Sequence, residues 1–290
     1  MLDALLATPA VLRLVDLALE EDLGRGDVTT EAVIDRDATA TAQLVARESL
    51  VLAGLGLCTL VFQRVDAEVV AAESAKDGDR IAAGTAVASY RGRAASLLAA
   101  ERTALNFVQR LSGTATLARA FVEAAAGSRL RIADTRKTTP GFRLLEKYAV
   151  RVGGASNHRC DLGSGLLIKD NHVAVAGGVR QAVEKARGRA PHGLRIEVEV
   201  DSLAELEEAL AAGADVILLD NFSPADLDRA VARTGPLPQR PLLEVSGGVT
   251  LRRIPELARA GVDIVSVGAL THSARAVDLS LDIGINGPGQ

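Results

Sequence analysis

The chain has 290 residues, and 48 % of them are hydrophobic, which is enough for one large domain or two ordinary ones. Aromatic residues make up only 2 % and the net charge is -4, which disfavours a protein that stacks nucleic-acid bases on aromatic rings or attracts anions by an overall basic field. Any binding of anions must therefore be local, by a few cations gathered in one cleft.

The features that report on cellular location point away from secretion and membranes. Cys58 and Cys160 form neither a CxxC pair nor a zinc-type spacing. The N-terminal residues lack the basic start and apolar run of a secretion signal, and the longest apolar stretch, residues 50–62, is too short to span a bilayer. These features predict a reduced, cytoplasmic protein with no nucleic-acid and no membrane partner.

The first part of the chain predicts a small α+β unit. Residues 3–23 carry apolar side chains at helical spacing, with a helix start at Thr8-Pro9. Between residues 39 and 90, the segments ATAQLVA, SLVLAGL, AEVVAAES and AVASYRG predict strands, with a turn-rich connection between the last two. A helix is predicted over 96–126, with a break near Ser112-Gly113.

After Gly127, short apolar strands alternate with amphipathic helices roughly every 20 to 35 residues, which predicts parallel strands with crossover helices. Ser202 and Ser223 are predicted N-caps, and Gly213 and Gly235 are predicted helix ends. The predicted strands are 130–133, 166–168, 196–200, 216–219, 242–245 and 264–267. Such a pattern fits a barrel or a doubly wound sheet. Because six strands are fewer than the eight of a full barrel, the preferred prediction is an α/β fold with an open, incomplete TIM-like barrel.

Polar residues follow the ends of these strands, on the face where a parallel α/β barrel places its active site. In chain order they are Arg136 and Lys137; Lys169, Asp170 and Asn171; Glu199 and Asp201; Asp220 and Asn221; Ser246, Gly247 and Gly248; and Gly268. Six successive strands that end in this way predict one polar site built from distant parts of the sequence.

Two of these strand ends are typical of phosphate binding. SGGVT follows one strand and SVGAL follows the next, and glycines there let backbone N–H groups approach an anion closely. Barrels often bind phosphate with the loops after their last two strands. A plain tight turn is the alternative for either segment taken alone.

Glu199 and Asp220 end strands that are neighbours in the sequence and, by expectation, in the sheet. Carboxylates beside a phosphate site predict Mg²⁺, which binds one or two carboxylates together with substrate oxygens. The alternative is an ion-pair network with Lys137 and Lys169. Glu197 shares a strand with Glu199 and would point the same way, so the choice between them stays open.

Arginine and histidine residues supply the remaining candidates. His158 and Arg159 lie in a loop, where the planar fork of Arg159 suits a carboxylate. His158 is expected to be a substrate hydrogen-bond partner, with general base as the alternative, and its spacing to Cys160 disfavours a Cys/His hydrolase. Arg102 lies on an apolar helix and, on this evidence alone, pairs with Glu101 or extends to solvent.

A series of segments from about Glu21 to Ile283 resembles, in order, the quinolinate phosphoribosyltransferase family. The segments are EDLGRGDVTT, ERTALNFVQRLSGTAT, DTRKTTPGFRLLEKYAVRVGGASNHR, LLIKDNH, EVEVDS, ILLDNF, LEVSGGVT and VGALTHSARAVDLSLDI. The resemblance implies transfer of phosphoribosyl from 5-phosphoribosyl-1-pyrophosphate to quinolinate with decarboxylation, giving nicotinate mononucleotide, pyrophosphate and CO2 in NAD biosynthesis. It also implies an N-terminal α/β sandwich (residues 1–110, with 274–290 returning to it), an open barrel (111–273), a homodimer and a requirement for Mg²⁺.

The resemblance assigns roles to individual positions. It implies catalytic roles for Lys137, Lys169, Glu199 and Asp220, with Glu199 and Asp220 also holding Mg²⁺, either directly or through substrate or water. It implies quinolinate binding by Arg102, Arg136, His158 and Arg159, with Arg102 reaching the partner subunit's site. It implies phosphoribosyl-pyrophosphate binding by Ser246, Gly247, Gly248, Gly268, Ala269 and His272.

Departures from the family pattern at Ser164-Gly165, Thr114 and Leu117 remove no charged site residue and put only the stiffness of a loop in doubt.

Three other functions remain open. The chain could be a paralogous phosphoribosyltransferase or pyrophosphorylase for another ring acid, a Schiff-base barrel aldolase using Lys137 or Lys169, or a binding scaffold without turnover.

Overall fold

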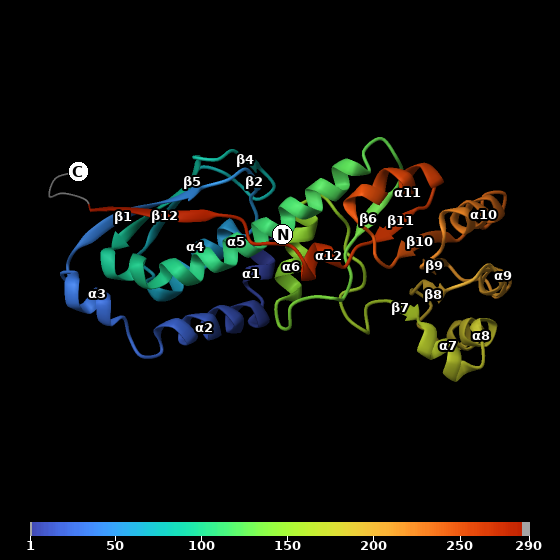
Figure 1. The fold of residues 1–290 in the computed structure, drawn as a ribbon. Coiled ribbons are helices and arrows are strands. Elements are labelled where there is room, and N and C mark those ends of the chain that lie inside the picture. The colour runs from blue at the N-terminus through green and yellow to red at the C-terminus, as the bar shows by residue number, and fades with distance from the viewer. Residues whose placement is uncertain (1, 286–290) are drawn as a thin grey trace. The chain divides into compact units, whose positions relative to one another are not determined.

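The structure, a computed structural model, describes residues 2–285 and divides into two compact units (Figure 1). Unit 1 comprises Met1–Arg119, Thr139–Gly154 and Ser273–Gln290, and unit 2 comprises Ala120–Thr138 and Ala155–His272. Among the described residues, no helix is both long enough and apolar enough to cross a membrane.

Unit 1 is built on a four-stranded antiparallel sheet of order β12-β1-β5-β3. Its strands are β1 (Thr39–Ala46), β3 (Val70–Glu73), β5 (Ala86–Arg93) and β12 (Leu279–Ile285), and β2 (Leu50–Val51) pairs with β4 (Arg80–Ile81) in a separate ribbon. The last described strand, β12, lies beside the first strand, β1, so the C-terminal segment joins the sheet of unit 1 (Figure 1). Residues 286–290 of the predicted returning segment lie outside the described residues.

The segment that leads into β12 is held by Glu48. Its carboxylate accepts hydrogen bonds from the Arg275 guanidinium, one of them at 2.7 Å, and from the backbone N–H of Asp278 at 2.9 Å. These bonds lower the pKa of Glu48 to about 2, with the Arg275 hydrogen bond as the main cause.

The helices of unit 1 are α1 (Leu2–Leu6), α2 (Pro9–Leu23), α3 (Val28–Val33), α4 (Leu55–Val65), the long α5 (Ala94–Ala124), which continues into unit 2, and α6 (Arg143–Val152). The helix start expected at Thr8-Pro9 is confirmed, since Thr8 is the N-cap of α2.

The strand predicted over SLVLAGL is mostly wrong, because only Leu50–Val51 is extended and α4 begins at Leu55. The carboxylate of Asp77, distant in sequence, accepts hydrogen bonds from the N–H groups of Gly54 (2.7 Å) and Leu55 (3.0 Å). These bonds satisfy backbone N–H groups at the start of α4. Because α4 is apolar on several faces, its sequence has no clear helical periodicity and cannot be distinguished from a buried strand.

The break predicted near Ser112-Gly113 is also wrong, because α5 runs through both residues. The Ser112 hydroxyl is buried and donates to the backbone oxygen of Ala53 (3.2 Å), while it accepts from the Ala53 N–H (3.0 Å). A Cβ atom at Gly113 would lie 1.9 Å from the backbone oxygen of Arg275. The small residues therefore allow close packing rather than interrupt the helix.

Unit 2 holds a parallel six-stranded sheet of order β6-β11-β10-β9-β8-β7. Its strands are β6 (Arg131–Ala133), β7 (Leu166–Ile168), β8 (Ile196–Val200), β9 (Val216–Asp220), β10 (Leu242–Ser246) and β11 (Ile264–Ser266). All six predicted strands are confirmed. Within the described part of the chain the sheet is open between β6 and β7, which confirms the open α/β barrel.

The helices of unit 2 are α7 (Asp170–Ala176), α8 (Val179–Arg189), α9 (Leu203–Ala211), α10 (Pro224–Thr234), η1 (Leu251–Arg253), α11 (Ile254–Ala260) and α12 (Ala269–His272). The Ser202 and Ser223 hydroxyls accept hydrogen bonds from backbone N–H groups in the first turns of α9 and α10, so both predicted N-caps are confirmed. Short βα connections of this kind bring the strand ends together on one face.

Candidate active site

A cavity of about 550 Å³ in unit 2 is lined by residues at or just beyond the carboxyl ends of all six parallel strands. It is lined by every residue of this unit to which the resemblance assigns a role: Arg136, Lys137, His158, Arg159, Lys169, Glu199, Asp220, Ser246, Gly247, Gly248, Gly268, Ala269 and His272. Four other members of the predicted strand-end set do not line it: Asp170, Asn171, Asp201 and Asn221. Residues up to 136 positions apart in the sequence therefore share one cavity, as the strand-end pattern predicts.

One side of the cavity carries an ion pair. Lys169, just after β7, donates from Nζ to Glu199 Oε2 at 2.6 Å, and Glu199 lies near the end of the neighbouring strand β8. The predicted ion-pair network is thus observed for Lys169 and Glu199. Asp220 ends the next strand, β9, and accepts a hydrogen bond at 2.8 Å from the side-chain amide of Asn221. Two carboxylates on adjacent strands offer the hard oxygen ligands that Mg²⁺ prefers.

The turn after β10 is shaped by two glycines. Gly247 and Gly248 have φ angles of 86° and 55°, in the left-handed region that glycine tolerates best. A Cβ atom at Gly247 would lie 2.7 Å from Asn221 Oδ1 and 3.0 Å from Asp220 Oδ1. The backbone of the turn therefore packs directly against the carboxylate that ends β9, and only glycine fits there.

The turn after β11 is equally close to charged side chains. A Cβ atom at Gly268 would lie 3.0 Å from His272 Nε2 and 3.2 Å from Lys137 Cδ. The Thr271 hydroxyl donates to the backbone oxygen of Lys137 at 2.7 Å and so joins the loop after β6 to α12. This turn brings a lysine and a histidine to the same part of the cavity.

Two guanidinium groups share another part of the cavity. Burial lowers the pKa of Arg159, and the nearby positive charge of Arg136 lowers it further, whereas Glu197 acts in the opposite direction. Two cations held this close favour an anion between or beside them.

Hydrogen bonds to Ser164, one of the residues that depart from the family pattern, stabilise the loop that follows Arg159. The Ser164 hydroxyl accepts from the N–H groups of Cys160 (2.9 Å) and Asp161 (3.1 Å), and the Asp161 carboxylate accepts from those of Gly163 (2.9 Å) and Ser164 (2.8 Å). Serine at this position therefore supplies its own loop-closing hydrogen bonds.

A further cluster, which the sequence reasoning missed in part, joins the half-buried His158 to two buried carboxylates. His158 Nε2 lies 3.2 Å from Glu197 Oε2 and 3.7 Å from Glu244 Oε1. Burial, and then the charge of Glu197, raises the pKa of Glu244 to about 7. Glu244 lines the cavity and was not predicted, and its sequence signal is an acid inside the otherwise apolar strand LLEVS.

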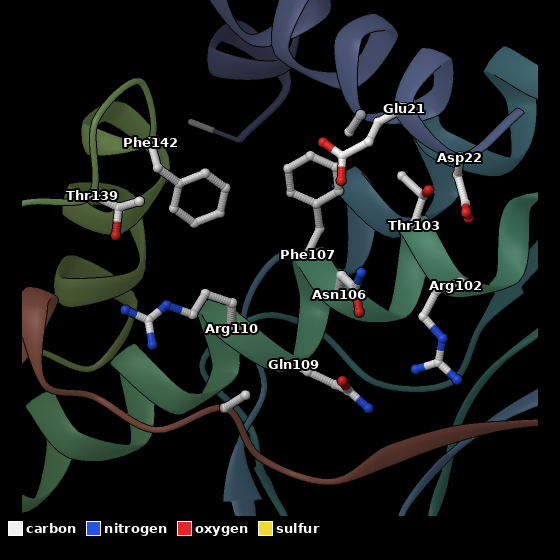
Figure 2. A pocket seen from close by; sticks show the side chains of 12 residues that line it. Glu21, Asp22, Arg102, Thr103, Asn106, Phe107, Gln109, Arg110, Thr139 and Phe142 are labelled. Atoms are coloured by element: carbon white, nitrogen blue, oxygen red, sulfur yellow. The ribbon is translucent and has the colours of Figure 1, made fainter. Parts of the chain in front are cut away.

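Arg102 is the one predicted site residue that lies elsewhere, in unit 1. It comes from α5 and helps to line a separate cavity of about 430 Å³ in that unit (Figure 2). Figure 2 shows Arg110 on the same helix, Glu21 and Asp22 from α2, and the rings of Phe107 and Phe142, whose centroids lie 5.8 Å apart. This cavity combines both signs of charge with an aromatic wall.

Comparisons with known proteins agree along most of the chain. The family model described as quinolinate phosphoribosyl transferase, N-terminal domain, matches residues 27–112, and the corresponding C-terminal domain model matches residues 114–282. The chain is 46 % identical over 270 residues to the nicotinate-nucleotide pyrophosphorylase [carboxylating] of Mycobacterium leprae, covering 92 % of this chain and 94 % of that one.

Two further relatives cover nearly the full length. The human nicotinate-nucleotide pyrophosphorylase [carboxylating] is 42 % identical over 283 residues, covering 97 % of this chain and 94 % of its own. The crystal structure of NadC from Streptococcus pyogenes superposes with a TM-score of 0.91 at 43 % identity, covering 97 % of this chain and 99 % of that one. The chain therefore belongs to the quinolinate phosphoribosyl transferase family.

Proposed function

We propose that this chain transfers phosphoribosyl from 5-phosphoribosyl-1-pyrophosphate to quinolinate with decarboxylation, and so yields nicotinate mononucleotide, pyrophosphate and CO2 for NAD biosynthesis. The observation that carries the proposal is the composition of the unit 2 cavity. Two arginines and two lysines line it together with an acid pair and two glycine turns. The family membership and the names of the relatives support the same reaction.

Quinolinate is proposed to bind at the guanidinium groups of Arg136 and Arg159, with Lys137 and Lys169 close by. A pyridine dicarboxylate carries two negative charges, and the mutual repulsion of the two arginines is relieved when carboxylates bind them. Each charge-assisted hydrogen bond contributes about 1.5–3 kcal/mol. A monocarboxylate would leave part of this positive charge unpaired, which favours the dicarboxylate over another ring acid.

The phosphoribosyl donor is proposed to bind where the glycine turns meet the acid pair. Ser246, Gly247 and Gly248 form the first turn, while Gly268, Ala269 and His272 form the second. Glu199 and Asp220 would hold Mg²⁺ there, which when bound neutralises charge on the pyrophosphate leaving group. Lys169 stabilises Glu199 with an ion pair and keeps this carboxylate oriented toward the cavity.

The chemistry needs positioning and charge stabilisation rather than a protein nucleophile. The ring nitrogen of quinolinate attacks C1 of the ribose and displaces pyrophosphate, which makes the ring a pyridinium. The pyridinium accepts the electron pair that remains on the ring when CO2 leaves, and the carbon then takes up a proton. Lys137, near the turn after β11, is proposed to stabilise the charge that develops during transfer.

The subunit organisation is also proposed. Arg102 lies in the cavity of unit 1 and is proposed to reach the active site of the partner subunit in a homodimer. The proposed location is the cytoplasm, which agrees with the biosynthetic role of the family and with two cysteines that form no disulfide.

The proposal is tested by incubating the purified chain with quinolinate, 5-phosphoribosyl-1-pyrophosphate and Mg²⁺ and following nicotinate mononucleotide, with nicotinate replacing quinolinate in a parallel reaction. We expect product from quinolinate only, and none after chelation of Mg²⁺. Arg136→Ala should mainly raise the KM for quinolinate, and Lys137→Ala should mainly lower kcat. Product from nicotinate, or none from either acid, would contradict the proposal.

A further inference from the structure

The two ring nitrogens of His158 already have partners inside the protein. The backbone N–H of Arg159 donates to His158 Nδ1 at 2.8 Å. His158 Nε2 faces two buried carboxylates, at 3.2 Å from Glu197 and 3.7 Å from Glu244. Because Nδ1 accepts a hydrogen bond, it carries a lone pair rather than a proton, so the ring proton is on Nε2 and is donated to Glu197.

The carboxylates that face Nε2 are an acid pair in the interior of the sheet. Glu197 on β8 is 8 % exposed and Glu244 on β10 is 2 % exposed. Glu244 Oε1 is buried and has no hydrogen-bond partner among the described residues. Burial, and then the negative charge of Glu197, raises the pKa of Glu244 to about 7, so this carboxyl holds its proton below that pH. His158, Ser266 on the adjacent strand β11 and Arg131 on β6 act in the opposite direction and lower the pKa.

The same segment is anchored from the other side by Asp134, which is fully buried just beyond β6. Its carboxylate accepts hydrogen bonds from the His158 N–H at 2.8 Å and from the Asn157 side-chain amide at 2.6 Å. The Arg159 guanidinium donates to the backbone oxygen of Gly165 at 3.1 Å. Every residue from 157 to 159 is therefore held by a specific hydrogen bond before any substrate binds.

We infer that His158 is a positioning residue: Glu197 and Glu244 hold it as the Nε2–H tautomer, and its Nδ1 fixes the backbone of Arg159 so that the Arg159 guanidinium is aligned for a substrate carboxylate. This inference rests on the proposed function, because it assigns the carboxylate to quinolinate. The expected role of His158 as a substrate hydrogen-bond partner stays a prediction.

Two other roles for this cluster conflict with the observed hydrogen bonds. A cationic His158 would carry a proton on Nδ1, which would point at the donating N–H of Arg159. A divalent cation between the three side chains, whose ligand atoms lie within 4.8 Å of one another, would need an unprotonated Nε2. With Nδ1 also accepting, the ring would then be an imidazolate, which forms only far above neutral pH.

The first test reads the tautomer directly by nitrogen NMR of the full-length protein labelled with ¹⁵N-histidine. The chain has 4 histidines, and His158 is assigned as the signal missing from the His158→Asn variant. We expect one protonated and one unprotonated ring nitrogen, both without and with saturating quinolinate. A ring protonated on both nitrogens in either state, or one that carries no proton on Nε2, would overturn the inference.

The second test uses a matched pair of variants. His158→Asn places an amide oxygen near the position of Nδ1 and keeps an acceptor for Arg159, whereas His158→Gln lacks that acceptor and places its amide near Nε2. We expect His158→Gln to raise the KM for quinolinate roughly 5- to 10-fold more than His158→Asn, about the effect of one hydrogen bond, with an unchanged KM for the phosphoribosyl donor. Equal losses, or a loss confined to kcat, would refute it.

The two tests separate the inference from the proposed function. If the wild-type protein fails to convert quinolinate, the proposed function is wrong, while the NMR measurement still decides the tautomer of His158. If His158→Asn fails to fold, as seen by circular dichroism, His158 is assigned in the labelled wild-type protein as the signal that persists in each of the variants His172→Asn, His192→Asn and His272→Asn.

Discussion

Replacing Glu244 with glutamine should remove a pH dependence from the stability of unit 2. Burial beside Glu197 raises the pKa of Glu244 from 4.5 to about 7, and glutamine keeps the size of the protonated carboxyl without its titration. A pKa difference of this size corresponds to about 3 kcal/mol of unfolding free energy.

The folded state binds the Glu244 proton more tightly than the unfolded chain does, so the unfolding free energy falls as the pH rises. Between pH 4.5 and about 7, the folded protein retains the Glu244 proton, whereas the unfolded chain has released it. Stability from this group is therefore fully present below pH 4.5 and is lost as the pH rises through 7. Relative to Glu244→Gln, the wild-type protein should lose about 3 kcal/mol of unfolding free energy across this range.

The assay is urea unfolding of the wild-type protein and Glu244→Gln at intervals from about pH 4.5 to pH 8, with the two free energies subtracted at each pH. Subtraction removes the titration of all shared groups. Glu184→Gln, on the exposed surface of α8, serves as the control and should give a difference with little pH dependence. A wild-type minus Glu244→Gln difference that stays constant over the range would refute the assignment of a protonated, buried Glu244.

Five other substitutions test the helix packing, the phosphate turns and the ion pair of Glu48. Gly113→Ala should lower the melting temperature because its methyl overlaps a backbone carbonyl, whereas Gly188→Ala, with no atom within 4 Å, should stabilise α8 by up to about 1 kcal/mol; the opposite order would contradict the packing. Gly247→Ala should raise the KM for the phosphoribosyl donor at least about tenfold, and Gly248→Ala, with open space around it, clearly less, because it incurs only the left-handed backbone cost of about 1–2 kcal/mol. Glu48→Gln should lower the melting temperature most above pH 4.5, and the deficit should shrink toward pH 2, since the stabilisation from a lowered pKa is lost as the pH falls; a constant deficit would argue against the ion pair.

The parallel strands of unit 2 and the polar residues that follow them were predictable because each strand is a short apolar run that ends in charge or glycine. Parallel topology alone then places Lys169, Glu199 and Asp220 on one face, whatever the details of packing. The N-caps Ser202 and Ser223 were equally readable, because a cap depends only on neighbouring residues.

The errors lie where a distant partner decides a local structure. Helix α4 depends on the carboxylate of Asp77, and the continuity of α5 depends on the fit of Ser112 and Gly113 against segments 59 or more residues away. Neither partner is visible in a window of neighbouring sequence, so periodicity and the usual preferences of glycine and serine misled the prediction.

The order of residues along the chain was sufficient to identify the strands, the cavity-facing charges and the family. Only the tertiary structure decided that Glu244, Glu197 and His158 meet, because their contact joins β10, β8 and a loop that lie far apart in the sequence. The protonation of Glu244 and the tautomer of His158 follow from that contact, since burial and proximity, rather than residue type, determine which buried groups hold a proton.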